Sequence, residues 1–427
     1  MNGAIGRRSR AGIAIAGVAG LALAGSLGMR LAPVSHAAAA GHCSGPTVSR
    51  QFFGKAFDLF AQKKLPVFRF TLKNCKDMTV QIISYGATIQ TINVPGHDHK
   101  VADVTLGFKT LNEYVTEDSP PPPAPGGPYF GETIGRYGNR IAKGTFHLNG
   151  KTFTLPLNNG PNSLHGGFVG FGNHVWASHA FTGHGVAGIH FTLVSPNGDD
   201  GKNVGCNCTG YPGKLTVHVT YFLDNGGNLG IHYQATVAGT PTVLNLTNHA
   251  YFNLAGEASG PVYNQVVQIN AGHFTPTDAT LIPTGQIAPV AGTPFDFTHP
   301  KPIGRDITDN NVQLIQAHGF DHNWVLNSTG PTFRGLHLAS RAFDPESGRE
   351  LTVWTDQPGV QFYTGNFLDG SLVGISGHTY RQSWGYTFET QHFPDSPNHP
   401  NFPSTVLKPG QVFKSTTFYS FSTVHGH

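Results

Sequence analysis

The sequence predicts an all-β protein built as one large antiparallel β-sandwich. Three features of the 427-residue chain support this prediction: its 55 glycines and 30 prolines, its charged fraction of only 12%, and its short alternating segments separated by turn residues. The charged fraction is about half of the usual share in globular domains. Helical patterns are confined to short pieces such as residues 309–317. Many strands with short connections favour a sandwich or a barrel.

Residues 1–40 are predicted to be a signal peptide with its cleavage region, and residues 45–427 a single domain. Three arginines within residues 7–10 form a basic start, residues 11–29 are apolar, and residues 35–40 offer small side chains for cleavage. This order is typical of an export signal. Because the apolar segment is weakly hydrophobic for a spanning helix, we expect export to the periplasm or the extracellular space, with no membrane association after cleavage.

Four cysteines follow the predicted cleavage region: Cys43, Cys75, Cys206 and Cys208. In an oxidising compartment they allow two disulfides, with three possible connectivities. A bond between Cys206 and Cys208 is expected to be strained, so we expect each of them to pair elsewhere. Cys-x-Cys without a second close pair is not a zinc pattern, and no metal site is predicted.

The predicted domain alternates between strand-like runs and turns. Residues 79–94 contain two β-rich runs, and Gly86 between them indicates a bend. Residues 147–153 place Asn-Gly between β-prone flanks, which strongly indicates a hairpin. Residues 215–223 and 231–237 alternate apolar and polar side chains around a glycine-rich turn. This pattern predicts an antiparallel pair with one buried face.

Two insertions interrupt the strand pattern. The segment Pro120–Pro125 is rich in proline, and residues 203–209 carry Cys-Asn-Cys. We expect both to be surface elaborations, because proline cannot donate to a sheet ladder. The proline loop is also a candidate for the rim of a binding site.

Composition and motifs give no support to several classes of partner. The net charge of +3 is small for this length and does not favour nucleic acid or an anionic membrane. The 23 histidines are spread along the chain, so they do not mark a metal-binding tract. The sequence contains no P-loop, dinucleotide fingerprint or nucleophile elbow. We therefore expect a small-molecule partner and no cofactor.

Glu389 is the first candidate for chemistry. It follows the apolar run Trp384–Phe388, precedes a proline-rich loop, and is one of only seven glutamates in the chain. A carboxylate at a strand end among aromatic residues can have its pKa tuned for proton transfer. The structural alternative for this residue alone is a glutamate that caps backbone amides.

Further segments carry side chains that suit the hydroxyl groups of a sugar. The candidates are Asn139, Arg140, His165, His249, Asp321 and Gln361. Amides, guanidinium groups and imidazoles offer the donors and acceptors that hydroxyls need. Asp321 is expected to be exposed by the glycine turn before it. Taken singly, each histidine is more often structural than catalytic.

Together these segments resemble the aldose 1-epimerase (galactose mutarotase) family over about residues 51–422. The matching motifs are Gly135–Ile141, Asn158–Gly167, Thr247–Leu254 and Glu389–Asn398, in the family's order. The resemblance implies a large β-sandwich that interconverts the α and β anomers of free hexoses such as glucose and galactose. It implies no metal, nucleotide or redox cofactor.

The resemblance also implies roles for individual residues. It makes Glu389 the general base and His249 the general acid. It implies substrate contacts for Asn139, Arg140, His165, Tyr251, Asp321 and Gln361. The chain departs from many relatives at Asn173-His174, where they have a basic residue, and in its two insertions, and these departures bear on substrate preference.

Three other functions stay open from the sequence. A binding-only relative would keep the sugar contacts and lose the acid or the base, whereas both are present here. An epimerase of phosphorylated sugars would need more basic residues near the site. A glycosidase would need two carboxylates at a defined separation, and Asp321 is a candidate for the second. Monomer and homodimer are both compatible with the sequence.

Overall fold

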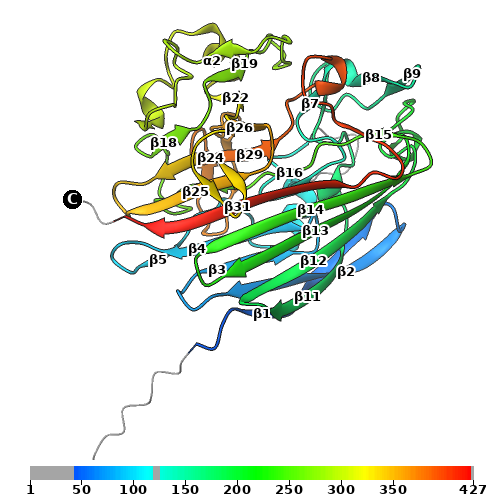
Figure 1. The fold of residues 1–427 in the computed structure, drawn as a ribbon. Coiled ribbons are helices and arrows are strands. Elements are labelled where there is room, and N and C mark those ends of the chain that lie inside the picture. The colour runs from blue at the N-terminus through cyan, green and yellow to red at the C-terminus, as the bar shows by residue number, and fades with distance from the viewer. Residues whose placement is uncertain (1–42, 119–125, 425–427) are drawn as a thin grey trace, which may run out of the picture. The chain divides into compact units, whose positions relative to one another are not determined.

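Antiparallel strands dominate residues 43–118 and 126–424, which are the residues that the computed structural model describes (Figure 1). The predicted signal segment 1–40 and the Pro120–Pro125 loop lie outside the described residues. Within the described ranges, no helix has the length and apolar character needed to cross a membrane.

The first sheet contains five strands in sequence order. They are β1 (Thr47–Asp58), β2 (Lys63–Lys73), β3 (Thr79–Ile83), β4 (Thr88–Pro95) and β5 (Val101–Asp103). Gly86, with a φ of 68°, lies in the turn between β3 and β4. Glycine adopts this left-handed conformation without steric cost, so the predicted bend is confirmed.

The second sheet contains ten strands. Its path runs through β11 (Ala177–Gly183), β12 (Val186–Ser195), β13 (Lys214–Asp224), β14 (Asn228–Ala238), β31 (Phe413–Thr423), β25 (Arg349–Thr355), β24 (Leu336–Phe343), β18 (Val266–Ile269) and β21 (Lys301–Pro302), and β23 (Thr332–Phe333) pairs with β24. The predicted hairpin is confirmed as β13 and β14, which pair from Lys214 opposite Ala238 to Leu223 opposite Leu229.

The third sheet contains six strands. They are β17 (Tyr251–Phe252), β29 (Tyr386–Gln391), β26 (Gly359–Tyr363), β22 (Asp321–Val325), β19 (His273–Thr275) and β20 (Ala288–Pro289), in this order. Figure 1 shows β22, β26 and β29 above β31 and β14 of the ten-stranded sheet. This sheet carries several of the predicted site residues.

Short pairs complete the β structure. They are β6 (Thr133–Ile134) with β16 (Thr247–Asn248), β7 (Arg140–Ile141) with β10 (Ser163–Leu164), β8 (Thr145–Leu148) with β9 (Lys151–Thr154), β15 (Thr242–Val243) with β30 (Val406–Leu407), and β27 (Asp369–Val373) with β28 (Thr379–Arg381). Asn149 and Gly150 join β8 to β9 with positive φ angles of 51° and 72°. This conformation fits a tight hairpin turn, and the prediction from Asn-Gly is confirmed.

The helices are short. They are α1 (Leu111–Glu113), α2 (Val312–Ala317), the π-helical turn η1 (Tyr114–Asp118) and the 3₁₀ turns η2 (Ala142–Gly144), η3 (Phe171–Asn173), η4 (Lys202–Val204), η5 (Ile303–Arg305) and η6 (Ser396–Asn398). The helical pattern at residues 309–317 therefore yields only α2. Asn311 caps α2 by accepting a hydrogen bond from the N–H of Gln313 at 2.9 Å, so the helix starts later than the pattern indicates.

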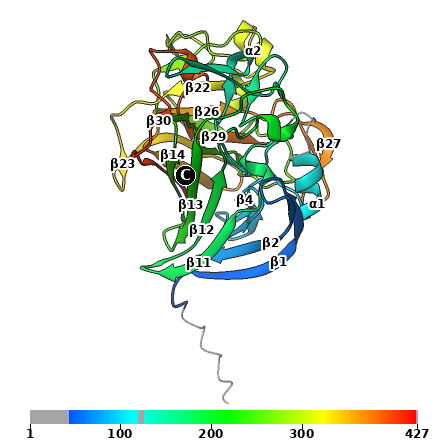
Figure 2. The ribbon, with the colours of Figure 1, turned by 90° about the vertical axis from the view of Figure 1, so that its right-hand side faces the viewer.

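The main core is one buried cluster of apolar side chains from all three large sheets. It includes Ile82 of β3, Val219 of β13 and Phe362 of β26. Figure 2 shows β1 and β2 curving beside β11 and β12, which they contact. The predicted all-β antiparallel sandwich is confirmed.

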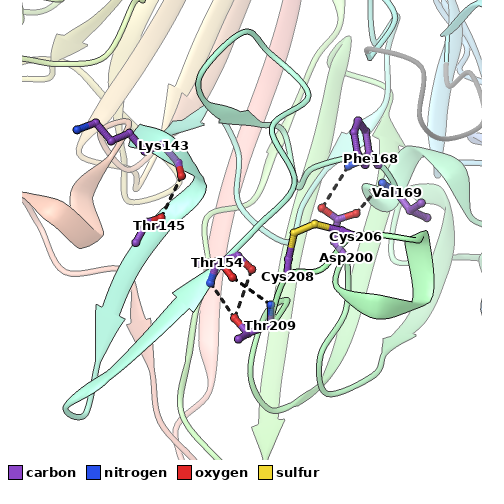
Figure 3. The surroundings of a disulfide bond; sticks show 9 residues. All are labelled: Lys143, Thr145, Thr154, Phe168, Val169, Asp200, Cys206, Cys208 and Thr209. Atoms are coloured by element: carbon purple, nitrogen blue, oxygen red, sulfur yellow. Dashed lines mark hydrogen bonds between the residues drawn. A yellow bond between two sulfur atoms is a disulfide. The ribbon is translucent and has the colours of Figure 1, made fainter.

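The disulfides correct one expectation. Cys43 pairs with Cys75, and Cys206 pairs with Cys208 instead of with a distant cysteine (Figure 3). The chain between η4 and β13 brings the Cα atoms of Cys206 and Cys208 to 5.1 Å. That separation lies within the usual range of about 4.4–6.8 Å.

Candidate active site

A cavity of about 550 Å³ brings most of the predicted site residues together. Its wall includes seven of the eight predicted side chains: Asn139, Arg140, His165, His249, Tyr251, Asp321 and Glu389. The eighth, Gln361, lies behind the wall, where its Nε2 donates to Oδ1 of Asp321 at 2.7 Å. The fold therefore gathers side chains that are far apart in the sequence.

Glu389 lies inside β29 rather than at the end of a strand, and it is only 2% exposed. Thr387, two residues earlier in the strand, donates from Oγ1 to Oε1 of Glu389 at 3.0 Å. Burial is the main cause that raises the pKa of Glu389 to about 8, and the charge of Asp321 acts in the same direction. The Thr387 hydrogen bond and the charge of Arg140 lower that pKa.

His249 lies between β16 and β17, outside any strand. Its Nε2 is 3.4 Å from Oε1 of Glu389. The rings of Tyr129, His165 and Tyr251 surround it, with centroids 5.8, 5.0 and 5.1 Å away. Burial lowers the pKa of His249 to about 3, so the imidazole is neutral near pH 7.

The opposed pKa shifts of Glu389 and His249 determine how many protons the pair carries. Between the lowered pKa of about 3 and the raised pKa of about 8, the two groups share one proton. In the free protein that proton lies on Glu389, because burial disfavours two separated charges. Transfer across the 3.4 Å contact would create a carboxylate and an imidazolium without proton exchange with solvent.

His165 has a tautomer set by the backbone of Asn139. The backbone N–H of Asn139 donates to Nδ1 of the His165 ring at 3.1 Å. The backbone N–H of His165 donates to the carbonyl of Asn139 at 3.2 Å. Because Nδ1 accepts a hydrogen bond, the neutral ring carries its proton on Nε2. Burial lowers the pKa of His165 as well. The ring therefore offers an N–H donor.

Asp321 corrects a further expectation. It is the first residue of β22 and only 6% exposed, because it pairs with Tyr363 of β26 in the interior of the six-stranded sheet. Gln361 holds Oδ1, and Nη1 of Arg140 lies 3.6 Å from Oδ2. Arg140 in turn donates from Nε to Oδ1 of Asn159 at 3.0 Å. These contacts form a fixed polar edge of the cavity.

Sequence reasoning missed several wall residues: Tyr129, Asn158, Asn159, Tyr363 and Phe367. Tyr363 lies two residues after Gln361, so the same strand-like segment contained the information needed to find it. Tyr129 follows the proline loop with a φ of 61°, a turn that no local pattern indicates. Glu117 and residues 126–129, which come before and after the undescribed residues 119–125, also line the cavity.

The wall carries little positive charge. Arg140 is the one Lys or Arg among its described residues, whereas its acidic side chains are Glu117, Asp321, Asp369 and Glu389. His174, from the Asn173-His174 segment, stacks on Phe60 with ring centroids 3.6 Å apart and does not line the cavity. The cavity therefore favours a neutral ligand over an anionic one.

Three wall residues are close enough to raise the question of a metal. Donor atoms of His165, His249 and Glu389 all lie within 4.8 Å of one another. However, Nδ1 of His165 already accepts from the Asn139 N–H. A metal on Nε2 would require the ring proton either to leave the ring or to move to Nδ1, where it would replace the hydrogen bond from Asn139. The arrangement therefore suits hydrogen bonding and proton transfer better than metal binding.

Comparison with known proteins agrees with this geometry. The sequence model of the aldose 1-epimerase family matches residues 69–420. Galactose mutarotase from Sus scrofa is 44% identical over 356 residues, which cover 83% of this chain and 94% of the relative. Aldose 1-epimerase from Escherichia coli (strain K12) is 34% identical over 358 residues, covering 83% and 95%. The crystal structure of galactose 1-epimerase from Lactobacillus acidophilus NCFM superposes with a TM-score of 0.74 at 28% identity, covering 89% and 99%.

Proposed function

This chain belongs to the aldose 1-epimerase family, and we propose that it interconverts the α and β anomers of free aldohexoses such as galactose and glucose. The observation that carries the proposal is the buried pair of His249 and Glu389, whose Nε2 and Oε1 atoms lie 3.4 Å apart on the cavity wall. Relatives named galactose mutarotase and aldose 1-epimerase support the same activity.

The proposed mechanism opens and closes the sugar ring by acid–base catalysis. Glu389 takes the proton of the anomeric hydroxyl while His249 gives a proton to the ring oxygen. The bond between the anomeric carbon and the ring oxygen breaks, and a carbonyl forms. Rotation about the neighbouring C–C bond presents the other face of the carbonyl, and the two proton transfers reverse. Each group should contribute about 10²–10⁴-fold to the rate.

Burial of the pair makes its charged, reactive form costly relative to its neutral form. With the ring closed, the reactive pair is a Glu389 carboxylate and a His249 imidazolium. After opening, Glu389 is protonated and His249 is neutral, which is the state favoured by pKa values of about 8 and about 3. The site therefore raises the energy of the charged reactant pair and stabilises the neutral pair that accompanies the intermediate.

Neutral sugars are the substrates that the wall supports best. Arg140 is already paired with Asp321, so no free Lys or Arg among the described wall residues would balance a phosphate. Because Gln361 and Arg140 also hold Asp321, this carboxylate is better suited to fixing hydroxyls than to serving as the second catalytic acid of a glycosidase. The presence of both acid and base argues against a binding-only protein.

Polarimetry on freshly dissolved α-D-galactose and α-D-glucose tests the function. The protein should accelerate the relaxation of optical rotation, and Glu389→Gln should reduce the enzymatic rate by about 10²–10⁴-fold, since it removes the base and retains the shape. If the wild-type protein binds the sugar but the optical rotation relaxes no faster than in buffer, the protein is a sugar-binding protein and not an enzyme.

We also propose that the mature protein is exported to the periplasm or the extracellular space. The basic and apolar order of residues 7–29, which lie outside the described residues, supports export. The disulfides Cys43–Cys75 and Cys206–Cys208 support an oxidising compartment. Mass spectrometry of the protein purified from cell fractions should find an exported form that lacks roughly the first 40 residues. A full-length cytoplasmic form alone would contradict export.

A further inference from the structure

We propose that Thr387 is a positioning residue that reserves one oxygen of Glu389 for the anomeric hydroxyl and stabilises the carboxylate form of that base. The inference rests on the proposed function and goes beyond it by naming the oxygen that reacts and the residue that selects it.

The strand geometry holds Thr387 in place. Side chains two residues apart in a strand share a face, so Thr387 and Glu389 both point from β29 toward the cavity. Thr387 is 0% exposed and lies directly opposite two residues of the wall, Tyr251 on β17 and Tyr363 on β26. A threonine side chain is also stiff at its first torsion angle. Its hydroxyl is therefore a fixed donor.

The two oxygens of Glu389 have different surroundings. Oε1 accepts the hydrogen bond from Oγ1 of Thr387 at 3.0 Å and lies 3.4 Å from Nε2 of His249. Oε2 is buried and has no hydrogen-bond partner in the described part of the chain. A buried carboxylate oxygen without a partner is costly, and a substrate hydroxyl would relieve that cost. The anomeric proton therefore goes to Oε2.

The charged and titratable groups that face Glu389 come from several elements. They are Arg140 on β7, Asp321 on β22, Tyr251 on β17, Tyr419 on β31, and His165 and His249 in loops. Burial and Asp321 favour protonated Glu389, whereas Thr387 and Arg140 favour the carboxylate. Since Arg140 is shared with Asp321, Thr387 is the donor devoted to Glu389.

Loss of the Thr387 hydroxyl should have two linked effects. The proton shared by Glu389 and His249 would lie more firmly on Glu389, so the reactive carboxylate–imidazolium pair would be rarer and ring opening slower. The pair would also keep its proton to higher pH. The alkaline limb of the pH–rate profile, which reflects the pKa of about 8, would then shift to higher pH.

Three variants separate this role from a structural one. Thr387→Val keeps the side-chain shape and removes the hydroxyl, whereas Thr387→Ser keeps the hydroxyl. Thr390→Val is the matched control, because Thr390 lies on the opposite face of β29, is 4% exposed and bonds to Oγ1 of Thr417 at 2.6 Å. Mutarotation of α-D-galactose is followed by polarimetry over a pH range that brackets the alkaline limb, with the spontaneous rate subtracted.

Thr387→Val should lower kcat by roughly tenfold and raise the alkaline limb by about one pH unit. Thr387→Ser should stay within about twofold of wild type, since the donor remains. An unmoved alkaline limb in Thr387→Val, or equal losses of kcat in Thr387→Val and Thr390→Val, would overturn the proposal.

A wild-type protein without mutarotase activity would instead overturn the proposed function. In that case, a ¹³C NMR titration of Glu389 would still test Thr387, because its valine variant should raise the pKa of the carboxyl, and an unchanged pKa would overturn the inference.

Discussion

Histidines of the cavity wall differ from those on the outer face of the ten-stranded sheet in what surrounds their rings. On the sheet face, Nδ1 of His190, His218 and His232 each lies 2.9 Å from the hydroxyl of a threonine directly opposite on a neighbouring strand. These rings are exposed or half-buried. His249 is 4% exposed, and its Nδ1 has no hydrogen-bond partner within residues 43–118 and 126–424.

The difference shows which observation distinguishes a reactive histidine from a structural one. A lowered pKa alone does not, because burial lowers the pKa of His190 and His232 as well as that of His249. A half-exposed ring bonded to a threonine needs no further partner. A buried ring with an unbonded nitrogen carries a desolvation cost that a ligand can relieve. His249 has this second combination and also lines the cavity, whereas His174 and His322, which are buried with an unbonded Nε2, do not line it.

The largest expected effect comes from exchanging one histidine in each region. His249→Asn should reduce kcat for mutarotation by about 10²–10⁴-fold, because asparagine cannot supply the proton to the ring oxygen. His190→Asn should leave the rate unchanged. Polarimetry on α-D-galactose measures both, and comparable losses in the two variants would remove the distinction between the regions.

A smaller loss is expected from the other wall histidine. His165→Ala removes the proposed Nε2–H donor to the substrate and leaves the N–H of Asn139 without its acceptor. We expect kcat/KM to fall by roughly tenfold to a hundredfold, mainly through a higher KM. His218→Ala on the sheet face is the control. A drop in kcat at unchanged KM would instead give His165 a part in proton transfer.

The sequence predicts the histidines of the cavity wall but not the arrangement of the histidines on the sheet face. The motifs around His165, His249 and Glu389 are contiguous in the chain, so local patterns and the family resemblance are sufficient to find them. The histidines of the sheet face come from separate strands, and they gather only because pairing places His190 opposite Thr220 and His218 opposite Thr192. Strand register depends on tertiary packing, which no single segment records.

The same limit explains other differences between prediction and structure. Asp321 follows a glycine turn, which indicates exposure, but its pairing with Tyr363 buries it. Local spacing argued against a bond between Cys206 and Cys208, whereas the path of the loop brings them together. Strand and hairpin positions were predictable because they depend on local alternation and turn residues.

The protonation of the cavity pair should also appear in the pH dependence of stability. The pKa of Glu389 is raised from 4.5 to about 8, so the folded state binds more protons than the unfolded state in this window and stability falls as pH rises. The pKa of His249 is lowered from 6.5 to about 3, so stability falls as pH decreases through that window.

Two variants separate these contributions. Glu389→Gln should raise the melting temperature relative to wild type above pH 8 and lose this advantage below pH 4.5. His249→Asn should raise the melting temperature relative to wild type below pH 6.5 and lose this advantage above that pH. Thermal unfolding followed by circular dichroism measures both, with His190→Asn as the control. If the melting temperatures of both variants followed pH in parallel with the wild type, burial would not set the charge of the pair.

The smallest effect is expected from a threonine on the sheet face. Thr220→Val removes the hydroxyl that bonds to Nδ1 of His190, as Thr387→Val removes the one that bonds to Glu389. Because the ring of His190 is exposed, water can replace the lost partner. We expect a change of less than about 0.5 kcal/mol in the free energy of unfolding and no change in the rate or in its alkaline limb. Chemical denaturation and polarimetry test this. A shift of the limb in Thr220→Val as large as in Thr387→Val would mean that the pH profile reports the whole protein rather than the bond to Glu389.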